Sequence, residues 1–172
     1  MGVAVTSEAR VWDQDAGRRA SGIGVGVYQH AHFGQKFGTD VGLLFSTGVD
    51  GHGHHRTDLA FTMPGLALRI PVEGKLQPYA STALVMTASF YSGPNGEGTI
   101  PFMFVGNRTA LGLEWRTAKD QSWFFEVATT LRGRFSVEKN DKDTLASHPD
   151  YARETALVHE VSFALGTAIF VL

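Results

Sequence analysis

Apolar and polar side chains alternate with a period of two along most of the chain. The clearest case is the segment at 155–171, where an apolar residue stands at almost every second position and mostly small or polar residues stand between. This period is typical of β-strands that present one apolar face. The pattern recurs between clusters of Gly, Asp, Asn and Pro and predicts eight strands, at 3–12, 22–33, 38–49, 58–72, 76–91, 101–117, 122–137 and 155–171.

The connections between these segments alternate in length. Those after the second, fourth and sixth strands are tight turns, at 34–37, 73–75 and 118–121. Those after the odd strands are longer and more polar, at 13–21, 50–57, 92–100 and 138–154. Short turns at one rim, long loops at the other and both termini on the short-turn side are typical of outer-membrane barrels.

Alternation alone does not say which face of a strand points outward, but two features favour an apolar exterior. The predicted strands are at least ten residues long, which suits tilted strands in a bilayer better than the usual soluble length of about 5–6 residues. Their polar face is rich in Gly and Ala, which leaves room for long charged side chains inside a narrow barrel. We therefore predict an all-β fold, an eight-stranded antiparallel up-and-down transmembrane β-barrel formed as a single domain by residues 1–172, in a bacterial outer membrane.

The fourth segment contains a change of phase. Leu59, Phe61 and Met63 share one face, and after Pro64-Gly65 the apolar positions are Leu66, Leu68, Ile70 and Val72. A β-bulge at Pro64-Gly65 would explain this change.

Composition narrows the chemistry. The chain has no cysteine, which excludes thiol chemistry and Cys-based metal sites. The formal net charge of -2 gives no reason to expect nucleic acid as a partner. The first residues lack the charged and apolar regions of a signal peptide, so an exported protein would be present here in its mature form.

The polar faces carry acids and bases in near balance, and we expect them inside the barrel. Unpaired buried charges are costly, so the simplest interpretation is a structural salt-bridge network that fills the lumen, and a narrow gated ion path is the alternative. Arg132 and Arg134 are expected to pair with carboxylates among Glu114, Glu126 and Glu160. The predicted network consists of Glu8, Arg10, His30, His32, Asp40, Arg108, Glu114, Glu126, Arg132, Arg134 and Glu160, with Tyr28 and Arg116 on the same inward face.

One loop sequence could bind a metal. His52, His54 and His55 stand close together between glycines, and imidazoles at such spacing can bind Zn, Ni or Cu. A polar loop tip is the simpler interpretation, so these histidines are weak metal candidates and we predict no metal and no cofactor.

In these patterns the chain resembles the small bacterial outer-membrane barrels typified by the transmembrane domain of outer-membrane protein A. It departs from their common C-terminal signal, because it ends Ile-Phe-Val-Leu, with Phe170 third from the end. The resemblance implies a structural, anchoring or surface-contact protein, with outer-membrane lipid and lipopolysaccharide as partners and a possible protein partner at the long loops. The loop at 138–154 carries both signs of charge and is the best candidate for such a contact.

Two other functions remain open. Some eight-stranded barrels are lipid A-modifying enzymes of the deacylase or acyltransferase type, and the deacylase has a lipid-facing Ser-His-Glu set. His159 is the ionisable residue on the apolar face of the last strand and Ser7 could neighbour it, but no acid is evident on that face. The third possibility is a soluble lipocalin-like carrier. We expect no enzymatic activity.

Overall fold

The computed structural model describes residues 2–14, 18–33, 36–50, 53–92, 99–135 and 157–170, and the described elements are all β-strands. No helix in these ranges is long and apolar enough to cross a membrane. The strands are β1 (Gly2–Gln14), β2 (Arg18–Phe33), β3 (Phe37–Asp50), β4 (His55–Thr62), β5 (Leu66–Arg69), β6 (Leu76–Ser92), β7 (Thr99–Arg116), β8 (Gln121–Phe135) and β9 (Leu157–Phe170).

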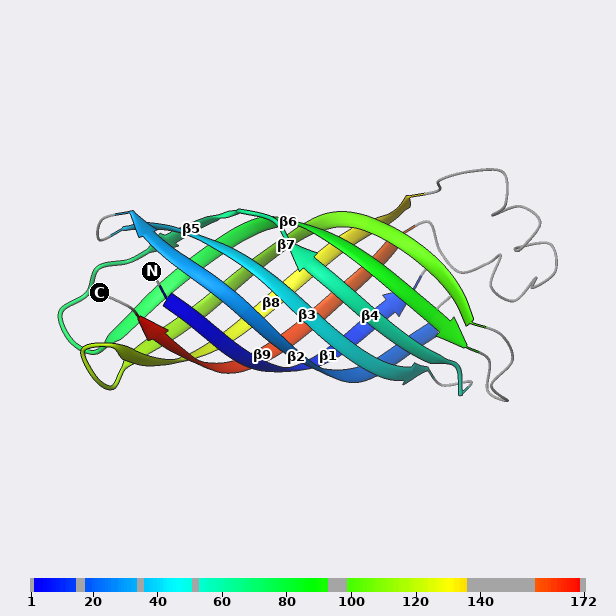
Figure 1. Cartoon of the computed structure of the whole chain (residues 1–172), viewed down its shortest axis with the longest axis horizontal. Coiled ribbons are helices and arrows are strands. Elements are labelled where there is room, and N and C mark those ends of the chain that lie inside the picture. The colour runs from blue at the N-terminus through cyan, green and yellow to red at the C-terminus, as the bar shows by residue number, and fades with distance from the viewer. Residues whose placement is uncertain are drawn as a thin grey trace.

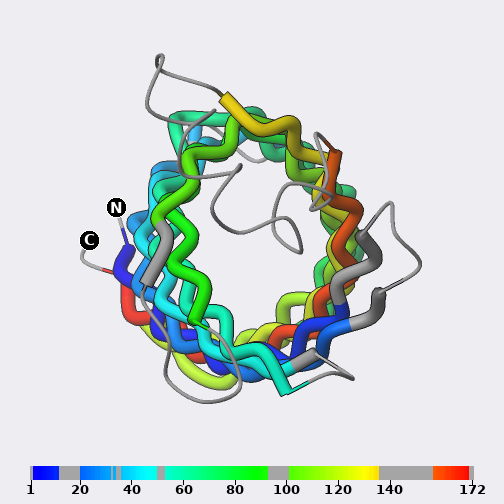
Figure 2. The backbone as a smooth tube through the Cα atoms, turned by 90° about the vertical axis from the view of Figure 1, so that its right-hand side faces the viewer, coloured from blue at the N-terminus to red at the C-terminus, as the bar shows by residue number. Residues whose placement is uncertain are grey.

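The strands form a closed antiparallel barrel (Figures 1 and 2). Strands adjacent in sequence pair with each other, except β4 and β5, and β1 pairs with β9 to close the ring. Both β4 and β5 pair with β3 on one side and β6 on the other, so together they make one interrupted strand of eight. The predicted fold class is confirmed.

The register fixes the tilt of the strands. A row of paired residues starts at Trp115 on β7 and runs once around the ring through β8, β9, β1, β2, β3, β4 and β6. It returns to β7 at Val105, ten residues from its start. Eight strands with this stagger tilt by about 40° to the barrel axis and leave an interior that side chains fill.

The structure has a bulge at Pro64-Gly65, as predicted. Thr62 pairs with Val85 and Leu66 pairs with Thr82, so residues 63–65 face only residues 83–84 of β6. The extra residue lets Met63 and Leu66 both face outward. Gly65 is needed there, because a Cβ would lie 2.3 Å from the carbonyl oxygen of Thr82.

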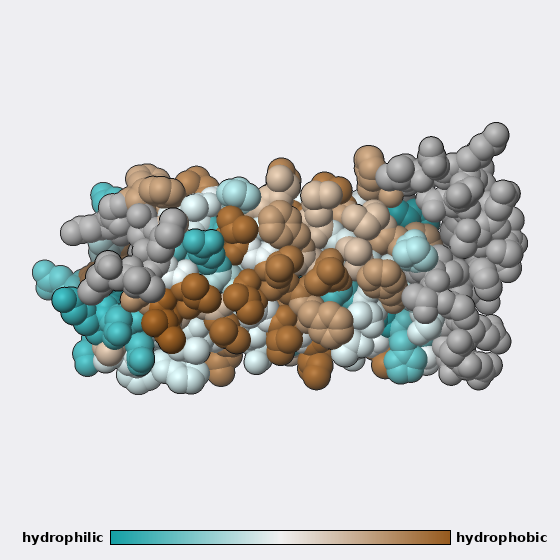
Figure 3. Space-filling model, viewed as in Figure 1, coloured by the Kyte–Doolittle hydropathy of each residue, from teal (hydrophilic) through white to brown (hydrophobic). Residues whose placement is uncertain are grey.

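The two faces of the wall differ sharply in polarity. Large apolar side chains are exposed on the outside of all nine strands, and Figure 3 shows hydrophobic residues gathered across the middle of the face in view. Most buried side chains that carry charge point into the lumen. A soluble lipocalin-like carrier needs the opposite arrangement, a water-compatible exterior and an apolar interior, so this surface argues against that alternative.

The ends of the chain and the tight turns lie together. Figure 1 shows the N and C ends at the same rim as the β5–β6 and β7–β8 turns. The strands reach further than the sequence suggested at the other rim: β2 starts at Arg18, β4 at His55 and β7 at Thr99. The remainder of the predicted long loops falls mainly outside the described residues.

Candidate functional site: the lumen

A layer of charged side chains crosses the lumen on the long-loop side of its middle. Its centre is Arg132 on β8, whose side chain has no exposed surface. The guanidinium donates from Nη2 to Asp58 on β4 (3.0 Å) and to Glu160 on β9 (2.9 Å). It also donates from Nη1 to the hydroxyl of Thr87 on β6 (3.0 Å). One side chain thus connects four strands around the barrel.

Two more arginines complete this arginine layer, which we define as Arg10, Arg56, Asp58, Arg132 and Glu160. Arg10 donates from Nε to Glu160 Oε1 (2.8 Å). Arg56 forms a bidentate pair with Asp58, in which Nε and Nη2 donate to the two carboxylate oxygens at 2.8 Å each. None of these side chains is more than 4% exposed. Bidentate and charge-assisted bonds are the stronger class of hydrogen bond.

Aromatic side chains cover the arginine layer. Tyr91, Phe102 and Phe104 are buried together with Ala20 and Val158. The guanidinium of Arg56 lies 5.3 Å from the Tyr91 ring centroid and that of Arg132 lies 5.6 Å from that of Phe104. Arg134 lies 5.4 Å from the Phe102 ring. These distances allow cation–π attraction, which is stronger where water is excluded.

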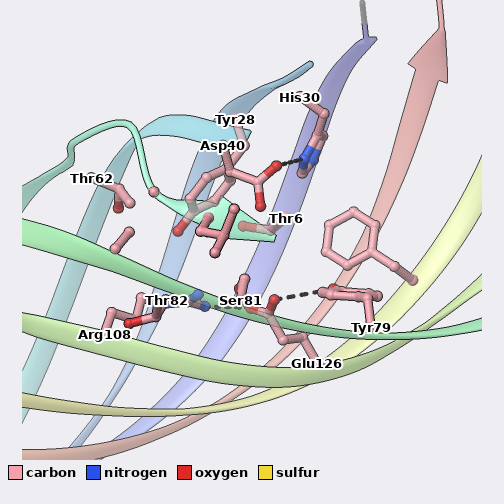
Figure 4. Close-up of a pocket in the computed structure, with 14 residues that line it drawn as sticks. Thr6, Tyr28, His30, Asp40, Thr62, Tyr79, Ser81, Thr82, Arg108 and Glu126 are labelled. Atoms are coloured by element: carbon pink, nitrogen blue, oxygen red, sulfur yellow. Dashed lines mark hydrogen bonds and ion pairs between the residues drawn. The ribbon is translucent and has the colours of Figure 1, made fainter. Parts of the chain in front are cut away.

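A second cluster lies on the short-turn side of the arginine layer. Figure 4 shows Tyr28, Tyr79, Arg108 and Glu126 of this cluster beside a small cavity. Arg108 pairs with Glu126 and lies 3.8 Å from Glu8. The hydroxyl of Tyr79 donates to Glu126 (3.0 Å) and that of Tyr28 donates to Glu8 (3.3 Å). The adjacent cavity has a volume of about 30 Å³, which is room for about two water molecules.

The last charged groups lie nearest the short turns. His30 pairs with Asp40, and Arg69 pairs with Glu114 at 3.2 Å. Arg116 was expected to face inward, and its Nε lies 3.9 Å from Glu114 Oε1 in the lumen. Its side chain is 48% exposed, because β7 ends at this residue.

Small residues make room for the aromatic side chains in the lumen. A Cβ on Gly42 would lie 2.2 Å from the Tyr28 ring, and a Cβ on Gly112 would lie 2.3 Å from the Tyr79 ring. The glycine-rich inner face is therefore a requirement of packing in a narrow barrel, as the sequence suggested.

The partners of the arginines differ from the expectation in part. Arg132 does pair with Glu160, but Glu114 pairs with Arg69 and Glu126 with Arg108. Arg56, Asp58 and Arg69 are lumen residues that were not predicted from the sequence. The alternation along the strands could have identified Asp58 and Arg69. Each is next to an apolar residue that faces outward in β4 or β5, so its own side chain must face inward.

Two histidine predictions are only partly covered by the structure. The side chain of His32 and all of His52 lie outside the described residues. His54 and His55 are described, at the start of β4. Within the part of the chain that is described, no three His, Cys, Asp or Glu side chains are close enough together to hold a metal ion.

The outer wall holds one hydroxyl–imidazole contact. Thr129 Oγ1 lies 2.7 Å from His159 Nε2, and both side chains are exposed on the lipid-facing side. Ser7 was expected beside His159, but it pairs with Leu165, six residues further along β9. The residue of β1 that pairs with His159 is Asp13.

Comparison with known proteins supports the fold alone. No family model and no curated protein sequence matches the chain. Among solved structures the barrel is similar to Neisserial surface protein A (NspA), with a TM-score of 0.72 and 9% identity over 98% of this chain and 95% of that one. It is also similar to Ail, the attachment invasion locus protein of Yersinia pestis (TM-score 0.57, 9% identity, 98% and 95% covered). A third similar structure is the outer membrane enzyme PagL (TM-score 0.51, 12% identity, 96% and 99% covered).

The chain has the fold of the small outer-membrane β-barrels. The resemblance predicted from the sequence pattern is confirmed at this level. The apolar exterior independently places the barrel in a membrane, since only lipid makes such a surface stable. The predicted outer-membrane location agrees with both observations.

Proposed function

We propose that this barrel is a closed, non-conducting anchor in the outer membrane, which holds surface loops at the long-loop rim. The observation that carries the proposal is the arginine layer. Its hydrogen bonds join β1, β4, β6, β8 and β9 across the interior. Buried charges that are paired resist opening, because separating them leaves a charge without a partner in a dry environment.

The aromatic side chains above the layer support closure. Tyr91, Phe102 and Phe104 are at most 5% exposed, so little water reaches the arginines from the long-loop side. An ion that crossed the barrel would have to displace both the rings and the ion pairs. We therefore favour the structural plug over the narrow gated ion path as the explanation of the lumen charges.

Conductance in planar lipid bilayers tests closure. Purified, folded protein should add no stepwise current to the bare membrane at about 100 mV. Arg116→Ala at the exposed mouth of the barrel should behave like the wild type. Stepwise channels in the wild type, with ion selectivity that changes in Arg132→Lys, would show that the arginine layer lines a conducting path instead.

A more specific role, contact at the cell surface, is suggested by the difference in length between the connections at the two rims. The stretch at 138–154 is the longest and carries both signs of charge, and in Ail a complex with the heparin analogue sucrose octasulfate has been solved. We propose that the long-loop rim contacts lipopolysaccharide or a protein partner. On intact cells, protease should cut within 138–154 and leave the turn at 73–75 intact. Cutting at 73–75 alone would reverse the orientation and remove this role.

A lipid A-modifying enzyme is the second candidate, and one observation favours it. The Thr129–His159 contact places a hydroxyl and an imidazole on the lipid-facing wall. A hydroxyl and a base are two of the three groups that acyl transfer requires, and the third is an orienting acid. Mass spectrometry of lipid A from cells with and without the protein tests it. A change in acylation that His159→Ala abolishes would support the enzyme, and unchanged lipid A would exclude it.

A further inference from the structure

A cluster of polar side chains interrupts the apolar exterior over β6, β7, β8 and β9. We call it the polar patch: Thr82, Asn107, Thr109, Thr129 and His159, all exposed on the outer face. The Asn107 amide donates to Thr82 Oγ1 (3.1 Å), and Thr109 Oγ1 donates to Asn107 Oδ1 (3.0 Å). These side chains come from adjacent strands, with Thr82 paired to Thr109 and Thr109 paired to Thr129.

The polar patch lies near the middle of the membrane, except for His159, which is closer to the long-loop rim. Thr109 stands on β7 midway between Trp115 and Met103, outward residues six positions away on either side. With strands tilted by about 40°, each residue adds about 2.5 Å of height, so Thr109 is about 15 Å from either. This depth is the centre of an apolar band about 25 Å tall.

An amide in the centre of a bilayer favours a hydrogen-bonding partner. Hydrocarbon offers none, and polar groups left without partners there are costly. Asn107 uses one amide N–H on Thr82, and among the described residues the structure shows no partner for the other N–H. The carboxamide therefore retains one N–H donor, while its oxygen accepts from Thr109 (3.0 Å) and from Thr82 (3.3 Å).

We propose that the polar patch is the contact between two copies of this chain. The polar patch is self-complementary, because the unused Asn107 N–H of one copy can donate to a hydroxyl or carboxamide oxygen of the other copy and the reverse. Two copies inserted in the same direction are related by a twofold axis along the membrane normal, which keeps every residue at its own depth. Asn107 then meets Asn107, as an isologous interface requires. Such polar contacts stabilise association inside membranes, where the hydrophobic effect does not.

The shape of the wall beside the polar patch fits the same arrangement. Pro78 and Ala80 form the floor of an outer groove of about 380 Å³, between Leu68 and Ile70 on one side and Leu111 and Leu113 on the other. This groove lies on the β5–β7 side of the patch. The twofold axis brings the β8–β9 side of the second copy against it, where Phe163 and Leu165 are exposed.

Disulfide trapping tests the interface, because the chain has no cysteine of its own. Thr109→Cys should form disulfide-linked dimers in vesicles of phosphatidylethanolamine and phosphatidylglycerol under mild oxidation. Val25→Cys is the matched control, since Val25 is exposed on β2, on the opposite side of the ring from β7. Equal linking at both positions, or no linking at 109, overturns the proposal.

Energy transfer between labelled copies at increasing lipid dilution measures the affinity. Asn107→Leu should raise the dimer dissociation constant by about tenfold, which corresponds to about 1.4 kcal/mol. Thr47→Val, which removes an exposed hydroxyl from β3, should leave it unchanged. Unboiled gel migration shows that each variant is folded before measurement. A wild type that is monomeric at every dilution, or an Asn107→Leu variant that associates like the wild type, overturns the proposal.

Discussion

Replacing Glu160 by Gln removes one charge from the arginine layer without changing its volume. The layer holds three arginines, with Asp58 and Glu160 as partners and Glu8 at 3.8 Å from Arg10. Three positive charges thus face three negative ones. In Glu160→Gln the balance is lost, and the new amide group presents donors to arginine donors.

The size of the effect follows from the contacts that are lost. Glu160 accepts from Arg10 Nε at 2.8 Å, from Arg10 Nη2 and from Arg132 at 2.9 Å, and it is 1% exposed. One charged interaction for each of the two arginines, at about 1.5–3 kcal/mol each, gives roughly 3–6 kcal/mol. Removing one partner of a buried pair costs about 3–5 kcal/mol. We expect the free energy of unfolding to fall by about 4 kcal/mol, within both ranges.

Urea unfolding in phosphatidylcholine vesicles, followed by Trp fluorescence and by unboiled gel migration, measures this loss. Glu73→Gln, in the exposed turn between β5 and β6, is the control and should change stability by less than about 0.5 kcal/mol. The double variant Arg10→Met/Glu160→Gln restores the charge balance and should lose less than the sum of the two single changes. A Glu160→Gln variant as stable as Glu73→Gln, or an additive double variant, would refute the reasoning.

Changes on the two faces of the wall should have distinct effects. Phe163→Arg, at mid-depth on the outer face, should lower the free energy of unfolding by about 2–4 kcal/mol. Leu157→Arg, near the rim, should lower it by at most about 1 kcal/mol. Equal losses in vesicle unfolding would contradict the assigned depth. Gly42→Ala should cost about 1–3 kcal/mol, because its methyl group meets the Tyr28 ring, and Tyr28→Ala in the same chain should remove most of that added cost in the same assay. A spin label at Leu165 should be accessible to oxygen and inaccessible to a water-soluble nickel complex, and the opposite result would place this face in water.

The strands could be predicted from the sequence because the period of two divides each strand into an apolar face and a polar face. Strand ends could not, because pairing continues beyond the apolar band through backbone bonds that ignore side-chain polarity. Arg18 pairs with Gln14 at the long-loop rim, although neither residue fits the apolar pattern. At the other rim β5 stops at Arg69, before Ile70 and Val72 complete the expected alternation. Ile70 donates to Pro78, and the proline has no N–H to return the bond.

Some lumen contacts could be predicted from the sequence and others could not. Parity alone places Arg132 and Glu160 inward on neighbouring strands, so their pairing could be anticipated. The contact between Arg132 and Asp58 joins residues 74 positions apart. It depends on the ten-residue stagger of the closed ring, which no local pattern reveals.

That stagger also separates carboxylates that parity treats alike. Glu114, Glu126 and Glu160 all face inward, yet only Glu160 stands at the level of Arg132, and the other two lie lower with Arg69 and Arg108. A barrel with the same strands and a different stagger would pair these groups differently and would leave some arginines without a carboxylate. The ion pairs therefore stabilise one register over its alternatives, in addition to filling the lumen, and a side chain such as Glu160 contributes to the choice of barrel as well as to its stability.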